Sequence, residues 1–224
     1  GFHKDSDHKA GIFADPSANR TMACATAFNL VCPYNTNNGQ RGCMFDILAT
    51  NTVTISCFDA SLYTGTTANY EIWYRPSTHV GFQNSSAGWT LLGTASGVTS
   101  AGNNLPTPLP IPIGVTIPAG QRYSFYITND FGGGTSYTDG TAVGNFLAGD
   151  ANMTTYEGVG KSYPFGLTFA VRNFNGTIYY DLGAVFDANE ATIAAEMKNE
   201  RVNLSWNVPE IENFQKVDLE YAKG

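Results

Sequence analysis

The sequence predicts an all-β protein whose main part is an antiparallel, jelly-roll-like β-sandwich. Short runs of alternating apolar and polar residues recur almost without break from about Thr21, as strands with one buried face require. Turn-forming clusters such as YTGTTAN, SAGNN and DFGGG separate these runs. Charged residues make up only 14% of the chain, whereas Gly (24), Tyr (12) and Phe (14) are abundant. This composition favours twisted strands joined by tight turns.

Eight segments are predicted to be strands of the sandwich. Alternation is cleanest in YEIWYR, where Tyr70, Ile72 and Tyr74 share one face. The predicted strands are Met44–Ala49, Val53–Phe58, Asn69–Arg75, Trp89–Ala95, Leu109–Ile117, Arg122–Thr128, Leu167–Arg172 and Thr177–Asp181.

The segment LPTPLPIPIGVTIPAGQ carries prolines at alternate positions. Its first four prolines share one parity, which leaves leucine, threonine and isoleucine on the other. Because proline cannot donate a backbone hydrogen bond, we predict an edge strand that donates only from the odd-numbered residues. A turn at Pro118-Ala119-Gly120 is then predicted to lead into a core strand.

Four cysteines lie in the first quarter of the chain, and four cysteines allow three pairings. The stretch CMFDILATNTVTISC is interpreted as a hairpin that turns near Thr50-Asn51 and places Cys43 opposite Cys57. We therefore predict the disulfides Cys43–Cys57 and Cys24–Cys32. The alternatives are four buried free thiols or a thiolate zinc site, for which the usual C-x2-C pairs are missing.

The sandwich is expected over residues 21–186. The two ends of the chain differ from it in sequence pattern. Residues 1–20 are polar and without periodicity, as in a tail or linker. Residues 187–224 are predicted to be a linker followed by three strands. Their apolar faces would need cover from a downstream segment or from a neighbouring subunit, because a lone hairpin is marginal in water. The residues of these two faces are Val202, Leu204, Trp206, Val217, Leu219 and Tyr221.

Several segments resemble, in order, a module of secreted, multidomain bacterial surface proteins, many of which look like cargo of the type IX secretion route. They are NNGQRGCMFDILATNTVTISCFDA, YEIWYRPSTHVG, WTLLGTASGVTSAG, PTPLPIPIGVTIPAGQRYSFYIT and GKSYPFGLTFAVRNFNGTIYYD, which together span residues 37–181. The resemblance implies a secreted β-sandwich and no known activity. VNLSW and FQKVDLEYAKG resemble the opening strands of a fibronectin type III-like, immunoglobulin-like domain, which is incomplete in this chain.

Charge and hydropathy argue against two classes of partner. The net charge is −7, from 12 basic and 19 acidic residues, and no cluster of Lys and Arg could neutralise a phosphate backbone. We therefore expect no nucleic acid as a partner. No apolar run approaches the ~20 residues of a membrane-spanning helix, so no membrane insertion is expected. Disulfides predict a secreted or cell-surface location.

Residues for catalysis are not evident in the sequence, and no enzyme activity is expected. The three histidines are His3, His8 and His79, and no nucleophile or zinc-protease motif accompanies them. His3 and His8 in HKDSDH are interpreted as part of a solvated tail rather than a metal site. Asp46 faces away from the predicted core and is interpreted as a solvated carboxylate.

Two binding sites are predicted instead. Asp130, Asp139 and Asp150 lie in Gly-rich loops that could hold Ca²⁺, and no other cofactor is expected. Trp73 and Trp89, with Glu71 and Arg75 beside Trp73, could stack on a sugar ring. The alternative is that Trp73 packs under a loop or against the second sheet.

The expected function is a non-catalytic extracellular surface module for adhesion or structural display in a larger secreted protein. Its partners would be other domains, neighbouring subunits or surface glycans. Two alternatives stay open. One is a subunit of an extracellular filament assembled by strand exchange, and the other is a carbohydrate-binding module of a secreted hydrolase.

Overall fold

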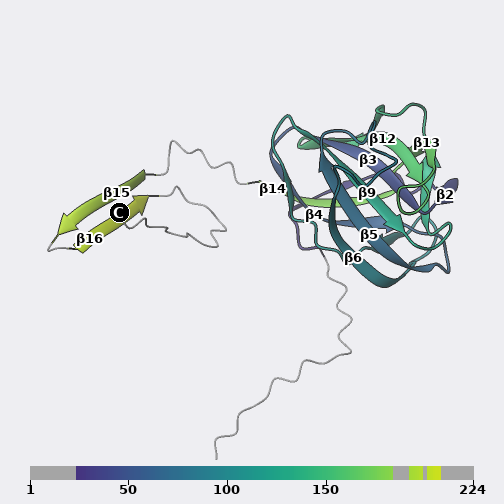
Figure 1. The fold of residues 1–224 in the computed structure, drawn as a ribbon, viewed down its shortest axis with the longest axis horizontal. Coiled ribbons are helices and arrows are strands. Elements are labelled where there is room, and N and C mark those ends of the chain that lie inside the picture. Colours follow the sequence, from purple (N-terminus) through teal and green to yellow (C-terminus); the bar gives the residue numbers. More distant parts are fainter. Residues whose placement is uncertain (1–23, 184–191, 199–200, 208–224) are drawn as a thin grey trace, which may run out of the picture.

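The structure of the 224-residue chain, a computed structural model, describes residues 24–183, 192–198 and 201–207 (Figure 1). All regular secondary structure within these residues is β-strand, and all strand pairs are antiparallel. The predicted all-β sandwich is thereby confirmed. In the described part of the chain there is no helix long and apolar enough to cross a membrane.

The larger layer of the sandwich is a nine-stranded sheet. Eight strands follow one another in the order β2-β10-β13-β12-β3-β9-β5-β6, and β11 pairs with β12. In that order they are Asn38–Gln40, Thr135–Asp139, Thr168–Asn173, Met153–Lys161, Gly42–Ala49, Arg122–Asn129, Thr67–Pro76 and Thr90–Thr99, with β11 at Phe146–Gly149.

The smaller layer is a five-stranded sheet ordered β1-β14-β4-β7, in which β8 also pairs with β4. These strands are Phe28–Val31, Gly176–Leu182, Val53–Ser61, Pro106–Pro108 and Val115–Ile117. The core lies between the two sheets, where Phe58 of β4 meets Phe45 and Phe125 at ring-centroid distances of 5.9 and 5.2 Å. Phe174 stacks on Phe45 at 4.3 Å. These phenylalanines join the layers through buried apolar contact.

Two of the three strands predicted near the end of the chain are present. They are β15 (Thr192–Lys198) and β16 (Arg201–Asn207), which pair with Ile193 opposite Trp206. Val202, Leu204 and Trp206 thus lie on β16, although their side chains are not described. The third predicted strand, with Val217, Leu219 and Tyr221, lies outside the described residues, as do His3 and His8.

The proline-rich segment largely behaves as predicted. Leu109 N–H donates to Phe58 O and Ile113 N–H to Ser56 O, each at 3.0 Å, so odd-numbered residues do supply the donors. Leu109, Ile111 and Ile113 are buried while the intervening prolines are exposed. The prediction of one continuous strand was wrong, because residues 109–114, between β7 and β8, do not form a regular strand although two of them still bond to β4.

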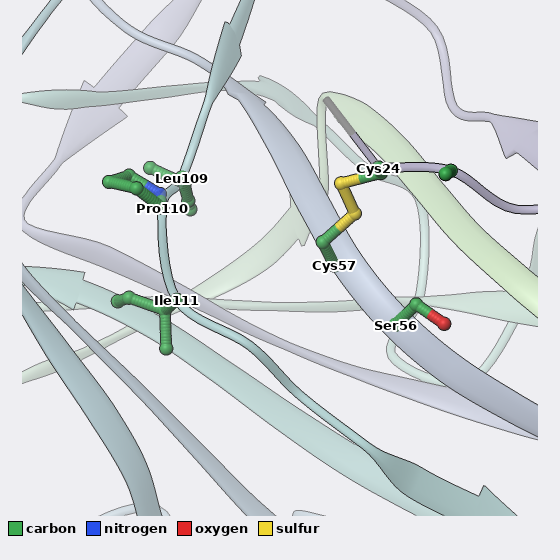
Figure 2. A pocket seen from close by; sticks show the side chains of 7 residues that line it. Cys24, Ser56, Cys57, Leu109, Pro110 and Ile111 are labelled. Carbon is green, nitrogen blue, oxygen red and sulfur yellow. A yellow bond between two sulfur atoms is a disulfide. The ribbon is translucent and has the colours of Figure 1, made fainter. Parts of the chain in front are cut away.

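The predicted hairpin between residues 43 and 57 was wrong, and so was the pairing of cysteines built on it. Cys24 is bonded to Cys57, with a Cα–Cα distance of 6.3 Å (Figure 2), whereas Cys32 and Cys43 are free and buried. Burial raises the pKa of Cys32 to about 12, and burial together with the Cys32 thiol also raises the pKa of Cys43. Both are therefore protonated thiols at neutral pH.

The cause of this error is that β3 and β4 belong to different sheets. The backbone N–H groups of Thr50 and Asn51 both donate to Asn152 O, so the connection crosses the edge of the sandwich instead of reversing on itself. Phe45 and Ile55 do point into the same core, as alternation predicted. They meet it from opposite layers.

We predict that replacing Cys57 with serine will lower the free energy of unfolding by about 2–4 kcal/mol, because the disulfide closes a loop with a sequence separation of 33. Urea unfolding followed by fluorescence measures the loss. Peptide mapping without reductant should recover a Cys24–Cys57 peptide, and Cys32 and Cys43 should react with an alkylating agent only after unfolding. A Cys43–Cys57 peptide would contradict the structure.

Candidate functional site

The outer face of the nine-stranded sheet carries the buried ionisable side chains and the tryptophans described below. This face turns away from the smaller sheet, and two connections contribute to it. The covering loop, residues 77–89, joins β5 to β6, and residues 162–167 join β12 to β13. A second apolar cluster, separate from the main core, forms between the sheet and these connections.

Asp46 of β3 anchors the covering loop. Its carboxylate is 2% exposed and accepts hydrogen bonds from His79 Nδ1 (2.6 Å), Thr78 Oγ1 (2.7 Å) and Ser124 Oγ (2.5 Å). Arg122 approaches it at 3.3 Å. Burial alone would raise the pKa of Asp46, but these hydrogen bonds and the charge of His79 lower it well below its usual value. The interpretation of Asp46 as a solvated carboxylate was wrong.

The serine, histidine and aspartate near this anchor do not form a nucleophilic triad. The single hydroxyl proton of Ser124 is shared between Asp46 Oδ1 (2.5 Å) and Ser77 O (2.9 Å), and Ser124 makes no hydrogen bond to His79. A base must be within hydrogen-bond reach of the hydroxyl that it activates. His79 is itself buried, and its Nε2 has no partner among the described residues. This arrangement fastens the loop.

The aromatic residues predicted to bind a ligand lie close together but cover one another. Trp73 meets Phe165 edge-on at 5.3 Å, and Trp89 packs against Tyr126 at 6.1 Å. Trp73 Nε1 donates to Glu71 Oε2 at 2.9 Å. Trp89 is buried and Trp73 half-buried, so the alternative that Trp73 packs under a loop is the observed arrangement.

Arg75, the fourth predicted ligand residue, is buried beneath Phe82 of the covering loop. Its guanidinium lies 3.4 Å from the centre of the Phe82 ring and donates to the carbonyl of Thr78. Phe82 is 43% exposed and borders an open hollow of about 350 Å³. The hollow is lined by Gly81, Phe82, Asn84, Ser85, Ala87 and Gly88. Sequence reasoning missed Phe82, although glycine and polar neighbours in VGFQN indicate an exposed ring.

Lys161 of β12 is a buried amine that sequence reasoning also missed. Its side chain has 0% exposure, and Nζ donates to Gly166 O (2.6 Å), Thr168 Oγ1 (2.7 Å) and Asn84 Oδ1 (3.1 Å). Among residues 24–183, no carboxylate lies within ion-pair distance of it. Burial lowers the pKa of Lys161 to about 8.

The three aspartates predicted to bind calcium each bond to different partners. Asp130 accepts from Asn69, Asp139 pairs with Arg172 at 3.2 Å, and Asp150 accepts from Tyr180 at 2.6 Å. Within the described ranges, no three acidic, histidine or cysteine side chains form a group that could hold a metal ion. Calcium binding by this set stays a prediction without structural support.

A smaller hollow of about 170 Å³ lies beside the disulfide, between β4 and the proline-rich segment (Figure 2). It is lined by Cys24, Ala25, Ser56, Cys57, Leu109, Pro110 and Ile111. Its surface is mainly apolar, and only Ser56 offers a side-chain hydroxyl. It lacks the converging polar groups of a small-molecule site.

In comparisons with known proteins, no protein-family model and no curated protein matches the chain.

Proposed function

We propose that this chain is a non-catalytic extracellular module that serves adhesion or structural display within a larger secreted protein. The observation that carries the proposal is that its acidic and histidine side chains are engaged in hydrogen bonds within the chain. Asp46 and His79 hold the covering loop, and Glu71 accepts from Trp73 and from Tyr163 (2.8 Å). Glu157 caps the backbone N–H groups of residues 141 and 142. A catalytic acid or base must instead be within hydrogen-bond reach of a substrate.

The extracellular location is supported by the disulfide. Disulfides persist in oxidising compartments and are rare in the cytosol. The low charge content and the resemblance to modules of secreted bacterial surface proteins support the same location. Other domains of the parent protein or neighbouring subunits would be its partners.

A second candidate function, carbohydrate binding, is favoured by the position of Phe82. The Arg75 guanidinium supports one face of its ring, and the ring edges an open hollow with Asn84 and Ser85 nearby. An exposed aromatic ring with polar neighbours is the surface on which a pyranose stacks. Phe82 therefore replaces Trp73 and Trp89 as the candidate platform.

One experiment on the purified chain tests both functions. We expect no turnover of polysaccharide, peptide or ester substrates. If the chain binds glycans, Phe82→Ala should weaken its retention on immobilised polysaccharide about 3- to 10-fold, because an aromatic stacking contact contributes roughly 0.5–1.5 kcal/mol. Phe131→Ala is the matched control, since Phe131 is 54% exposed on a different loop.

The outcomes separate the candidates. Turnover that disappears when Asp46 or Glu71 is replaced would overturn the non-catalytic proposal. Equal retention of all three proteins would rule out Phe82 as a platform and leave structural display. Antibody labelling of intact source cells tests display itself, and labelling only after cell lysis would contradict it.

A further inference from the structure

Lys161 stands out because a buried ammonium without a counter-charge is costly. Taking a charged amine out of water costs several kcal/mol unless an opposite charge compensates. Within the described part of the chain, Nζ of Lys161 has only neutral oxygen partners, at 2.6, 2.7 and 3.1 Å. Burial therefore disfavours the ammonium and lowers the pKa of Lys161 to about 8, so the neutral amine is the major form above that pH. A neutral amine is a nucleophile.

The partners of Lys161 form a closed triangle around a side-chain amide. Nζ donates to Thr168 Oγ1 at 2.7 Å, and Thr168 Oγ1 donates to Asn84 Oδ1 at 3.0 Å. Nζ also reaches Asn84 Oδ1 directly, at 3.1 Å. The amine and the carboxamide are thus in contact, and the Thr168 hydroxyl hydrogen-bonds to both.

We propose that Lys161 and Asn84 form an intramolecular isopeptide bond, which covalently joins β12 to the covering loop. The proposal concerns a modification of this chain and does not depend on the proposed function.

The reaction is balanced without any further reactant. The lone pair of neutral Nζ attacks Cγ of Asn84, while the Thr168 hydroxyl passes a proton from Nζ to Oδ1. The Cγ–Nδ2 bond then breaks, the carbonyl re-forms, and Nδ2 takes that proton back through Thr168 and leaves as ammonia. One amine and one carboxamide become one secondary amide and one ammonia.

The fold supplies the conditions for this step. The contact holds the amine beside the amide, which replaces a bimolecular encounter by an intramolecular one. Burial keeps water from Nζ, while Asn84 is exposed, so ammonia can escape to solvent. The bond would fix the covering loop at a second point, in addition to the anchor at Asp46.

Intact-mass spectrometry of the full chain, reduced and denatured after incubation above the Lys161 pKa of about 8, tests the proposal. We expect a mass lower than that of the sequence by one ammonia. A tryptic digest should contain a branched peptide joined at Lys161 and Asn84, with no cleavage after Lys161. The rate of ammonia loss should rise with pH until the amine is fully neutral.

Variants distinguish this bond from other changes at Asn84. Lys161→Arg and Asn84→Ala should both abolish the mass loss, and Thr168→Val should slow it about tenfold or more if Thr168 relays the proton. Thr168→Ser should restore the rate. Ring closure of an asparagine with its own backbone also releases ammonia, but it would persist in Lys161→Arg and give no branched peptide.

Three results would overturn the proposal. The first is an intact mass equal to that of the sequence. The second is ammonia loss that persists in the Lys161→Arg variant. The third is a glycan on Asn84, which begins the sequon Asn84-Ser85-Ser86 and would block its amide.

Discussion

Replacing Asp46 with alanine is expected to lower the free energy of unfolding by about 3–5 kcal/mol, the usual cost of removing one partner from a buried charged network. The substitution leaves the donors of Thr78, His79 and Ser124 without their shared acceptor. It also leaves the Arg122 guanidinium without its carboxylate. Because two of these donors begin the covering loop, the loss should also expose Trp73 and Trp89. Urea unfolding followed by tryptophan fluorescence measures both effects.

The same variant should change the acid stability of the protein. The pKa of Asp46 is lowered in the folded chain and lies near its ordinary value of about 4 in the unfolded chain. The stabilisation is therefore complete above about pH 4 and is lost as pH falls through the folded-state pKa. Stability should fall less steeply below about pH 4 in Asp46→Ala than in the parent protein.

Asp139→Ala is the matched control. Asp139 pairs with Arg172 at 3.2 Å, and its side chain is half-exposed. An exposed ion pair contributes at most about 1 kcal/mol, so this variant should stay close to the parent protein. If both alanine variants unfold at the same urea concentration, Asp46 is not the anchor that its contacts indicate.

Alternation along single strands predicted the faces of the sandwich well. Tyr70 and Ile72 are buried in the core, as the pattern in YEIWYR predicted, and Glu71 and Trp73 lie on the opposite face. The odd-numbered residues from Thr107 to Ile117 in the proline-rich segment are buried for the same reason. A period of two is a local property, and burial of one face follows from it directly.

The pairing of cysteines could not be predicted in this way, because it depends on which strands are neighbours. Cys43 belongs to the core between the two sheets, whereas Cys57 lies outside that core and is bonded to Cys24. The local pattern of β3 and β4 suits a hairpin equally well. One signal was available. Residues 42–47 are buried on both faces, and the unbroken run CMF is typical of a central strand rather than a hairpin arm.

The outer-face site depends on contacts between distant parts of the chain. Alternation places Asp46 away from the core, which is correct. The covering-loop residues that bond to it, Thr78 and His79, follow it by 32 and 33 residues in the sequence. The partners of Lys161 are similarly separated, with Asn84 77 residues away. No periodicity in a single sequence encodes such contacts, so the interpretation of Asp46 as solvated failed.

Strand β12 was missed altogether, although it is central in the larger sheet. Its sequence, MTTYEGVGK, contains two glycines, which weaken the signal for a strand. The structure shows a steric reason for a glycine at position 158. The register between β12 and β3 shifts between Tyr156 and Val159, and the backbone of β3 approaches Gly158 closely at this irregularity.

Replacing Gly158 with alanine is therefore expected to destabilise the sandwich by about 3 kcal/mol or more, the upper range for overpacking. The added Cβ would lie 1.8 Å from Met44 O and 2.9 Å from the Met44 carbonyl carbon. Both are backbone atoms of a central strand, so no side chain can rotate to make room. Either the β3–β12 ladder separates locally or the strand moves, and each breaks hydrogen bonds in the middle of the sheet.

Gly132→Ala is the control for loss of glycine itself. A Cβ at Gly132 would meet only the Arg41 side chain, at 3.8 Å, which is ordinary contact. Thermal unfolding should show this variant within a few tenths of a kcal/mol of the parent protein, while Gly158→Ala unfolds at a clearly lower temperature. Equal midpoints for the two variants would mean that β3 does not pass Gly158 at this distance. The bulge that places Lys161 on the outer face, beside Asn84, would then also be misplaced.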